Sequence, residues 1–206
     1  ISGNVSFYNE TEGRAIPPTP TIAVVGILND VAKRVTQHFK TPGDYILMVR
    51  TAKPSLAASE YEAMYGSSPE GLAAIDLGRE NSLVEALLGA AGAGLINSAH
   101  DVAEGGLGVA FAEACFNPDK ILGALIDGLS TSDAAELFGE GPSTIVISAN
   151  EKDVVQLGSI FQQNGIECRT IGRVTEQPRL SIGGSSIDDD VNELNRIYES
   201  ALPGRL

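Results

Sequence analysis

The sequence has 206 residues, of which 43% are hydrophobic and 20% are charged. This length can bury a sizeable core in one domain, or in one domain with an appendage. The formal charge of −13 argues against nucleic acid and anionic membrane surfaces as partners, because both are themselves negative. No apolar run approaches the roughly 20 residues of a membrane-spanning helix, so we expect no membrane partner.

The first twenty residues are rich in loop-forming side chains and end in Ile16-Pro-Pro-Thr-Pro20, which favours extended backbone. We expect them to form an entry loop and connector. Because the sequence starts at Ile1 rather than at Met, we also expect it to be part of a longer protein. The apolar residues 21–28 (TIAVVGIL) then predict a buried strand.

The middle of the chain alternates between helical and strand-like patterns. Ser82 and Glu85 have the spacing of a capping box, which predicts a helix over residues 82–94. Further strands are predicted over residues 45–51, 95–102, 121–126, 143–148, 167–174 and 179–182. Further helices are predicted over residues 59–65, 106–116, 131–138 and 152–163, with a short helical turn over 29–35.

The last predicted helix has Ile187, Val191, Leu194 and Tyr198 on one face. The three carboxylates Asp188–Asp190 stand near its start, where negative charge is favourable. Metal binding is the alternative role for these carboxylates, and helix-dipole partners are the favoured one. The sum of the elements predicts an α+β fold, a mixed β-sheet with helices packed on it.

The first candidate site is the segment from Gly3 to Ser6. Gly3 permits close approach of a phosphate, the side-chain oxygen of Asn4 can ligate Mg²⁺, and the hydroxyl of Ser6 can donate to a ligand oxygen. On these residues alone the favoured interpretation is a polar turn whose Asn and Ser bond to their own backbone.

The second candidate site is a corner at which a strand meets a glycine pair and a helix start. Gly105 and Gly106 let backbone approach a ligand, and the helix N-terminus presents N–H groups to an anion. His100, Asp101 and Glu104 place titratable groups at this corner, as an acid–base pair and a metal or ligand contact. The alternative is a buried histidine bonded to backbone, with the two carboxylates capping the helix.

Two smaller features complete the candidates. One is a basic cluster in an acidic chain, formed by Lys33, Arg34, His38 and Lys40, which faces either a phosphate, an acidic partner domain or solvent.

The other is the pair of cysteines. Cys115 and Cys168 lie in apolar or strand-like surroundings and form no CxxC pair, which predicts buried, reduced thiols in a cytoplasmic protein. With two histidines in the chain, a histidine-rich metal site is excluded.

A specific resemblance joins these segments. GNVSFYNET at 3–11, PPTP at 17–20 and HDVAEGGL at 100–107 are similar to the C-terminal part of the phosphoribosylformylglycinamidine synthase family, the PurL synthetase subunits of purine biosynthesis. The similarity in element order continues through Leu137-Phe138-Gly139-Glu140 and Ile171-Gly172-Arg173-Val174, so it covers nearly the whole chain. The HDVAEGGL pattern alone would also fit other members of the AIR synthase-related (PurM/PurL) superfamily, and the GNVSFYNET segment favours PurL.

The resemblance implies two A–B halves in the whole protein. Residues 1–20 would be the tail of the second, ATP-binding A domain, and residues 21–206 would be the second B domain, with a fold like the C-terminal domain of PurM. The upstream domains of the same chain, a glutaminase subunit and a small adaptor subunit would be its partners.

The activity implied is ATP-dependent amidation of formylglycinamide ribonucleotide with ammonia derived from glutamine, a ligase reaction that uses ATP and Mg²⁺. Gly3 would then contact ATP, Asn4 would ligate Mg²⁺ and Ser6 would contact the ribonucleotide. The corner from His100 to Gly106 would line a second cleft for an auxiliary nucleotide, and no catalytic residue is assigned. The alternatives are a structural or dimerisation domain, or part of another superfamily enzyme such as a selenophosphate synthetase.

Overall fold

The computed structural model describes residues 10–17, 22–66, 71–130 and 133–205, and divides the chain into two units, residues 1–31 and 32–206. In the first unit, strands β1 (Glu10–Thr11) and β2 (Arg14–Ala15) pair in antiparallel fashion around a turn in which Glu12 and Gly13 have positive φ.

Residues 22–28 form no strand, which corrects the strand predicted there. Their apolar side chains are exposed, with Val24, Val25 and Ile27 each at least 90% accessible. A strand needs a neighbour to pair with, and no described strand pairs with this segment. Residues 22–28 are apolar, but the burial expected from this composition does not occur within the described residues.

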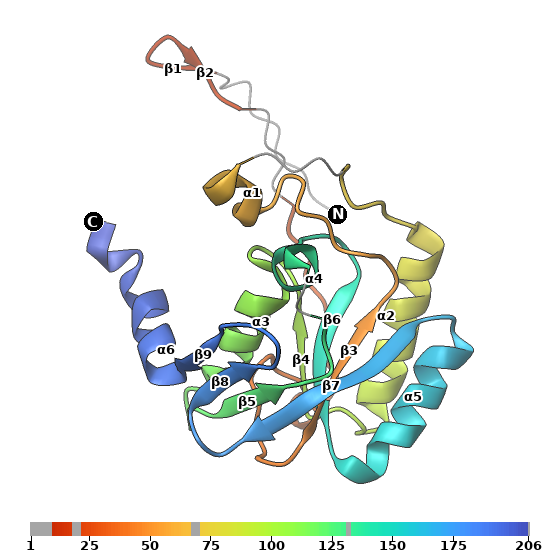
Figure 1. Ribbon diagram of the computed structural model, residues 1–206. Coiled ribbons are helices and arrows are strands. Elements are labelled where there is room, and N and C mark those ends of the chain that lie inside the picture. The colour runs from red at the N-terminus through yellow and green to blue at the C-terminus, as the bar shows by residue number, and fades with distance from the viewer. Residues whose placement is uncertain (1–9, 18–21, 67–70, 131–132, 206) are drawn as a thin grey trace. The chain divides into compact units, whose positions relative to one another are not determined.

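The second unit, residues 32–206, is built on a seven-stranded sheet in the order β4-β6-β3-β7-β5-β8-β9 (Figure 1). All described pairings in it are antiparallel except the parallel pair β5–β8, so the sheet is mixed. The strands are β3 (Tyr45–Arg50), β4 (Ser98–Asp101), β5 (Gly123–Ile126), β6 (Thr144–Ala149), β7 (Glu167–Thr175), β8 (Arg179–Ile182) and β9 (Asp188–Asp190).

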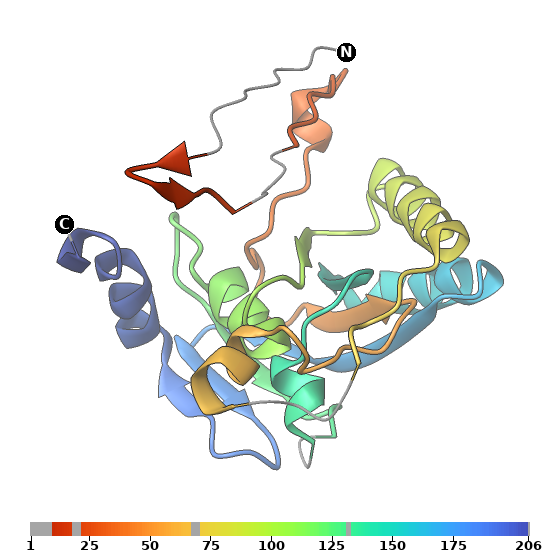
Figure 2. The same ribbon diagram turned by 90° about the horizontal axis from the view of Figure 1, so that it is seen from above.

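Helices cover both faces of this sheet, and Figure 2 shows α2 and α5 side by side on one face and α3 with α4 on the other. The α-helices are α1 (Glu60–Tyr65), α2 (Leu77–Gly92), α3 (Gly106–Cys115), α4 (Ala134–Phe138), α5 (Val154–Gln163) and α6 (Val191–Ser200). Short 3₁₀ turns are η1 (Val31–Lys33), η2 (Glu151–Asp153) and η3 (Pro203–Arg205). None of the helices in the described parts is both long and apolar enough to cross a bilayer.

Strand β3 explains the two-layer core, because both of its faces are buried. Ile46 and Met48 point to the layer of α3 and α4, and Leu47 and Val49 point to the layer of α2 and α5. Successive side chains of a strand alternate between faces, so a continuous apolar run fits a central strand. The predicted α+β fold with helices packed on a mixed sheet is confirmed.

The N-termini of α2 and α6 are built differently from the predictions. Helix α2 begins five residues earlier than predicted, because Asp76 rather than Ser82 caps it by accepting from the N–H groups of Gly78 and Arg79. The acidic residues Asp188–Asp190 form strand β9 beside β8 instead of the first helical turn. Asp190 does cap α6, so part of the predicted role is kept.

Candidate functional site

The glycine corner lies between the end of β4 and the start of α3. Gly105 and Gly106 both have left-handed backbone, with φ of 81° and 67°. A Cβ on Gly106 would come within 2.7 Å of the carbonyl oxygen of Leu137 and 2.8 Å of that of Gly139. Gly106 therefore allows the first turn of α3 to pack directly on the backbone of α4 and the residues that follow it.

The N–H group of Gly105 already has an anionic partner within the protein. It donates to Oε1 of Glu140 over 2.9 Å, and the same oxygen accepts from the N–H of Glu60 over 2.8 Å. The side chain of Glu140 thus ties α1 to the start of α3, although it lies 35 residues from Gly105 and 80 residues from Glu60 in the sequence. The Gly105 amide therefore binds the Glu140 carboxylate of the chain itself, where the sequence analysis expected it to bind the anion of a ligand.

His100 is held by a carboxylate of the neighbouring helix. Its Nε2 lies 2.9 Å from Oε2 of Glu113 on α3, and its Nδ1 lies 3.5 Å from Oδ1 of Asp101. The His100 side chain is 10% exposed, whereas that of Asp101 is 83% exposed. The alternative of a buried histidine is thus close to the geometry, although a side chain rather than backbone is the partner of Nε2, and the buried Nδ1 has no hydrogen bond to a described residue.

Asp101 faces a polar pocket of about 800 Å³, which also contains most of the predicted basic cluster. Arg34, His38 and Lys40 line this polar pocket together with Asp101. Its remaining lining residues are Ala32, Val35, Thr36, Gln37, Ala99, Asn117, Pro118 and Asp119. Three basic side chains in one pocket can bind a phosphate or carboxylate group, although Asp101 and Asp119 oppose an anion.

Burial shifts the pKa of two basic groups in this polar pocket. It lowers the pKa of His38, and the nearby His100 and Lys40 lower it further. Burial also lowers the pKa of Lys40, and the nearby Arg34 adds to this effect. The Nζ atom of Lys40 donates to the carbonyl oxygen of Asn97 over 2.5 Å. The geometry therefore fixes Lys40 at the wall of the pocket.

Glu104 and Gly105 face a different hollow, which we call the aromatic pocket. It measures about 400 Å³ and is lined by residues of α1, α3, α4 and the glycine corner. These residues are Glu60, Tyr61, Met64, Tyr65, Glu104, Gly105, Val109 and Phe138. The residues predicted for a second cleft are therefore divided: Asp101 lines the polar pocket and Glu104 the aromatic pocket.

Gly3, Asn4 and Ser6 lie outside the residues that the structure describes, so their roles stay predictions. Among the described residues, no group of three His, Cys, Asp or Glu side chains is arranged to hold a metal ion. This includes Asp188, which forms an ion pair with Arg179 instead.

Sequence reasoning missed two residues that organise the corner, Glu113 and Glu140. Both act across long stretches of sequence, 13 residues in the pair His100–Glu113 and 35 residues in the pair Gly105–Glu140. The only local signal for Glu113 is its place in the helix that follows the corner. Nothing near Glu140 in the sequence signals that it accepts from Gly105.

Comparison with known families decides where the chain belongs. Residues 41–185 match the model of the AIR synthase related protein, C-terminal domain. The chain belongs to the AIR synthase-related family. The match begins just before β3 and ends after β8, so the sheet and the helices packed on it are the shared domain.

Solved structures show the same AIR synthase-related fold. Thermotoga maritima phosphoribosylformylglycinamidine synthase II is 19% identical over 80% of this chain and 28% of its own, with a TM-score of 0.63. T. maritima PurL complexed with FGAR is 19% identical over 80% of this chain and 30% of its own, with a TM-score of 0.66. E. coli HypE, a hydrogenase maturation protein, gives 17% identity over 76% of this chain and 51% of its own, with a TM-score of 0.50. The chain thus spans less than a third of the length of the PurL structures it matches.

Proposed function

We propose that this chain is the second B domain, with the end of the preceding A domain, of a PurL-type synthetase. The whole protein would use ATP to convert formylglycinamide ribonucleotide and glutamine-derived ammonia to formylglycinamidine ribonucleotide, ADP and phosphate. The observation that carries the proposal is the AIR synthase-related match over residues 41–185, joined to the GNVSFYNET segment at 3–11. Structures of T. maritima PurL complexed with FGAR, ADP and ATP support this substrate class.

In this proposal, Gly3, Asn4 and Ser6 carry the chemistry that the chain contributes. The backbone at Gly3 contacts ATP, the side-chain oxygen of Asn4 ligates Mg²⁺, and the hydroxyl of Ser6 contacts the ribonucleotide. The Mg²⁺ ion would neutralise charge on the transferring phosphoryl group. The chain alone would not turn over substrate, because the remaining ATP-binding and acid–base groups lie in the upstream domains.

The exposed apolar residues 22–28 support those upstream domains as partners. A contiguous exposed patch of large apolar side chains marks an interaction surface in a protein that is otherwise well packed. The glutaminase and adaptor subunits would be further partners of the whole cytoplasmic complex. Of the corner from His100 to Gly106, Asp101 would serve the auxiliary nucleotide cleft, because it lines the polar pocket, whereas Glu104 and Gly105 face the aromatic pocket. Arg34, His38 and Lys40 of the polar pocket would lie toward the phosphates of that nucleotide.

The test is a steady-state assay of the full-length protein that contains this chain, with ATP, ammonia and formylglycinamide ribonucleotide. We expect turnover by the wild type and a loss of about 10²-fold or more with Asn4→Ala, since a misplaced metal no longer stabilises the transferred phosphoryl group. His100→Ala should leave most of the turnover and lower stability instead. Equal losses from both substitutions would contradict the assignment of Asn4. Turnover by the isolated chain would contradict the placement of the remaining ATP-binding and acid–base groups in the upstream domains.

A further inference from the structure

The aromatic pocket has a composition that the proposed function does not use. Three aromatic rings stand together in its wall: the ring centroids of Tyr61 and Phe138 are 5.6 Å apart and nearly parallel, and those of Tyr61 and Tyr65 are 4.7 Å apart. The two tyrosines come from α1 and Phe138 ends α4. The faces of aromatic rings carry partial negative charge, which attracts cations.

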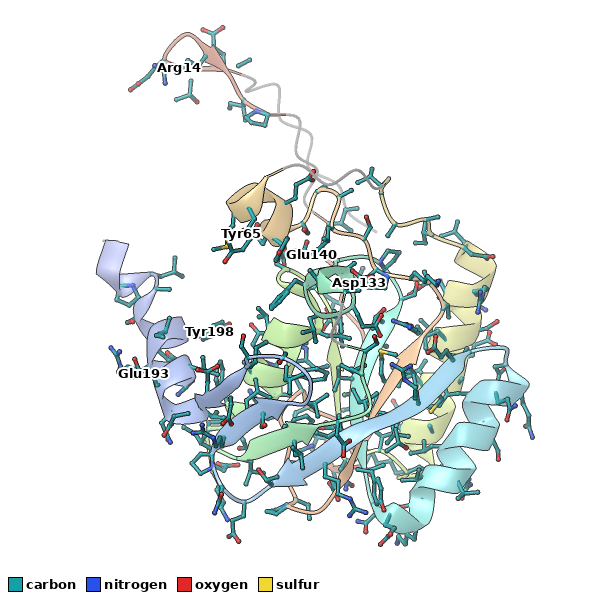
Figure 3. All side chains as sticks on the ribbon, in the orientation of Figure 1. Arg14, Tyr65, Asp133, Glu140, Glu193 and Tyr198 are labelled. Carbon is teal, nitrogen blue, oxygen red and sulfur yellow. The ribbon has the colours of Figure 1, made fainter. Side chains whose placement is uncertain are left out.

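Carboxylates surround these rings. Glu60 and Glu104 line the pocket directly, and neither side chain has a hydrogen bond or ion pair within the parts of the chain that the structure describes. Glu140 lies just behind, bonded to Gly105 and Glu60, and Figure 3 shows it close beneath Tyr65 and α1. The described lining contains no Lys, Arg or His. The charge of this pocket is therefore negative, and it suits a cation rather than a phosphate.

The rim of the aromatic pocket has the character of a protein interface. Met64 and Tyr65 are 72% and 70% exposed, although both are large and apolar. Exposed methionine and tyrosine side chains beside a well-formed pocket are typical of the centre of protein–protein interfaces, where arginine is also enriched. A volume of about 400 Å³ leaves room for one long side chain.

We propose that the aromatic pocket binds an arginine side chain of a partner polypeptide, with the guanidinium stacked on the tyrosine rings and paired with Glu60 and Glu104. Arginine fits better than lysine, because its planar guanidinium stacks on aromatic faces and can bond to two carboxylates at once. The net charge of −13 adds a general attraction for a basic segment. This inference is independent of the amidation reaction proposed above.

The two methionines of the chain provide a direct test. Met64 lies on the rim of the pocket, whereas Met48 is fully buried in β3 and serves as the internal control. In ¹³C-methyl-methionine NMR spectra of the 206-residue chain, titration with N-acetyl-arginine amide should shift the Met64 signal, assigned with Met64→Leu, and leave the Met48 signal in place. N-acetyl-citrulline amide, which has the same shape without the charge, should cause no comparable shift.

Glu104→Gln should weaken binding of the arginine probe by roughly two- to fivefold, the size expected for one exposed charge or cation–π contact. Glu199→Gln on α6, outside the lining of the pocket, should leave binding unchanged, and an unshifted Met48 signal would show that each variant is folded. Equal response to the arginine and citrulline probes would overturn the proposal. So would tighter binding of tetramethylammonium than of the arginine probe, since that result would indicate a small quaternary amine as the ligand.

Discussion

The Nε2 atom of His100 on β4 and the Oε2 atom of Glu113 on α3 lie 2.9 Å apart, and this contact joins the sheet to the helix that starts at the glycine corner. The imidazole is almost fully buried and the carboxylate is 23% exposed. A buried polar group that loses its partner retains the cost of its removal from water.

The first prediction follows from that contact. Glu113→Ala should lower the free energy of unfolding by about 1–3 kcal/mol, because the His100 ring would be left buried without its carboxylate. Urea unfolding monitored by circular dichroism measures this change. Glu199→Ala on the exposed face of α6 is the control and should stay within about 0.5 kcal/mol of wild type. A wild-type midpoint for Glu113→Ala would show that the contact contributes nothing.

Two glycines with opposite surroundings give the second prediction. Gly106→Ala should destabilise the chain by about 1–3 kcal/mol or more, because φ is positive there and the new methyl group would meet the carbonyl oxygens of Leu137 and Gly139. Gly89→Ala, in the last turn of α2 with open space where the new methyl group would lie, should instead stabilise by up to about 1 kcal/mol. Thermal unfolding of both variants tests the pair, and the same sign of change in both would refute the account.

Much of the fold could be predicted because the strongest patterns belong to buried elements. The run YILMVR predicts a strand over 45–51, and β3 spans 45–50 with every apolar side chain but Tyr45 fully buried. The segment 21–28 has a similar composition and forms no strand. The difference lies in strand pairing: β3 pairs with β6 and β7, whereas no described strand pairs with residues 22–28.

The candidate site was harder to predict than the fold, for a physical reason. The glycine pair was visible in the sequence because backbone conformation is a local property. The partner of the Gly105 amide was not visible, since Glu140 reaches it through tertiary packing of α4. Likewise, the division of Asp101 and Glu104 between two pockets depends on where α1 and residues 34–40 lie, which spacing does not reveal.

Arg50 gives a third prediction. Its guanidinium lies between two carboxylates, 3.0 Å from Glu136 and 2.9 Å from Glu167, and its side chain is only 10% exposed. Arg50→Lys should cost about 1–3 kcal/mol, because a single ammonium group cannot bond to both carboxylates in this geometry. Urea unfolding in low and high salt provides the measurement. Arg196→Lys in the exposed pair with Glu193 is the control, with an expected change below about 1 kcal/mol.

The fourth prediction concerns pH. Burial holds the pKa of His38 below its usual 6.5, so the unfolded chain binds this proton more readily than the folded chain does. Stability should therefore fall as the pH drops from 7.5 through 6.5 to 5.5. His38→Gln removes this group, so the decline over that interval should be shallower in the variant. An identical pH dependence of the unfolding midpoint in both proteins would contradict the role of His38.

Thiol chemistry gives the fifth prediction. Burial raises the pKa of Cys115 to about 12 and that of Cys168 to about 11, so both thiols are protonated at pH 8. Iodoacetamide should modify both far more slowly than a free thiol, and Cys168, which is the less buried, before Cys115. Peptide mass spectrometry after timed alkylation distinguishes the sites. Rapid modification of Cys115 in the native chain would be inconsistent with its place in the core.

The central position of β3 has a consequence for how the chain acquires its fold during synthesis. Residues 45–50 emerge early, but they hydrogen-bond to residues 144–149 and 167–173, which emerge much later. Contacts between residues so far apart in sequence slow folding, because a long loop must close before they form. The two edges of β3 must therefore wait for the last third of the chain to pair. A nascent chain that stops before residue 167 would present this strand with an open edge to its neighbours on the ribosome.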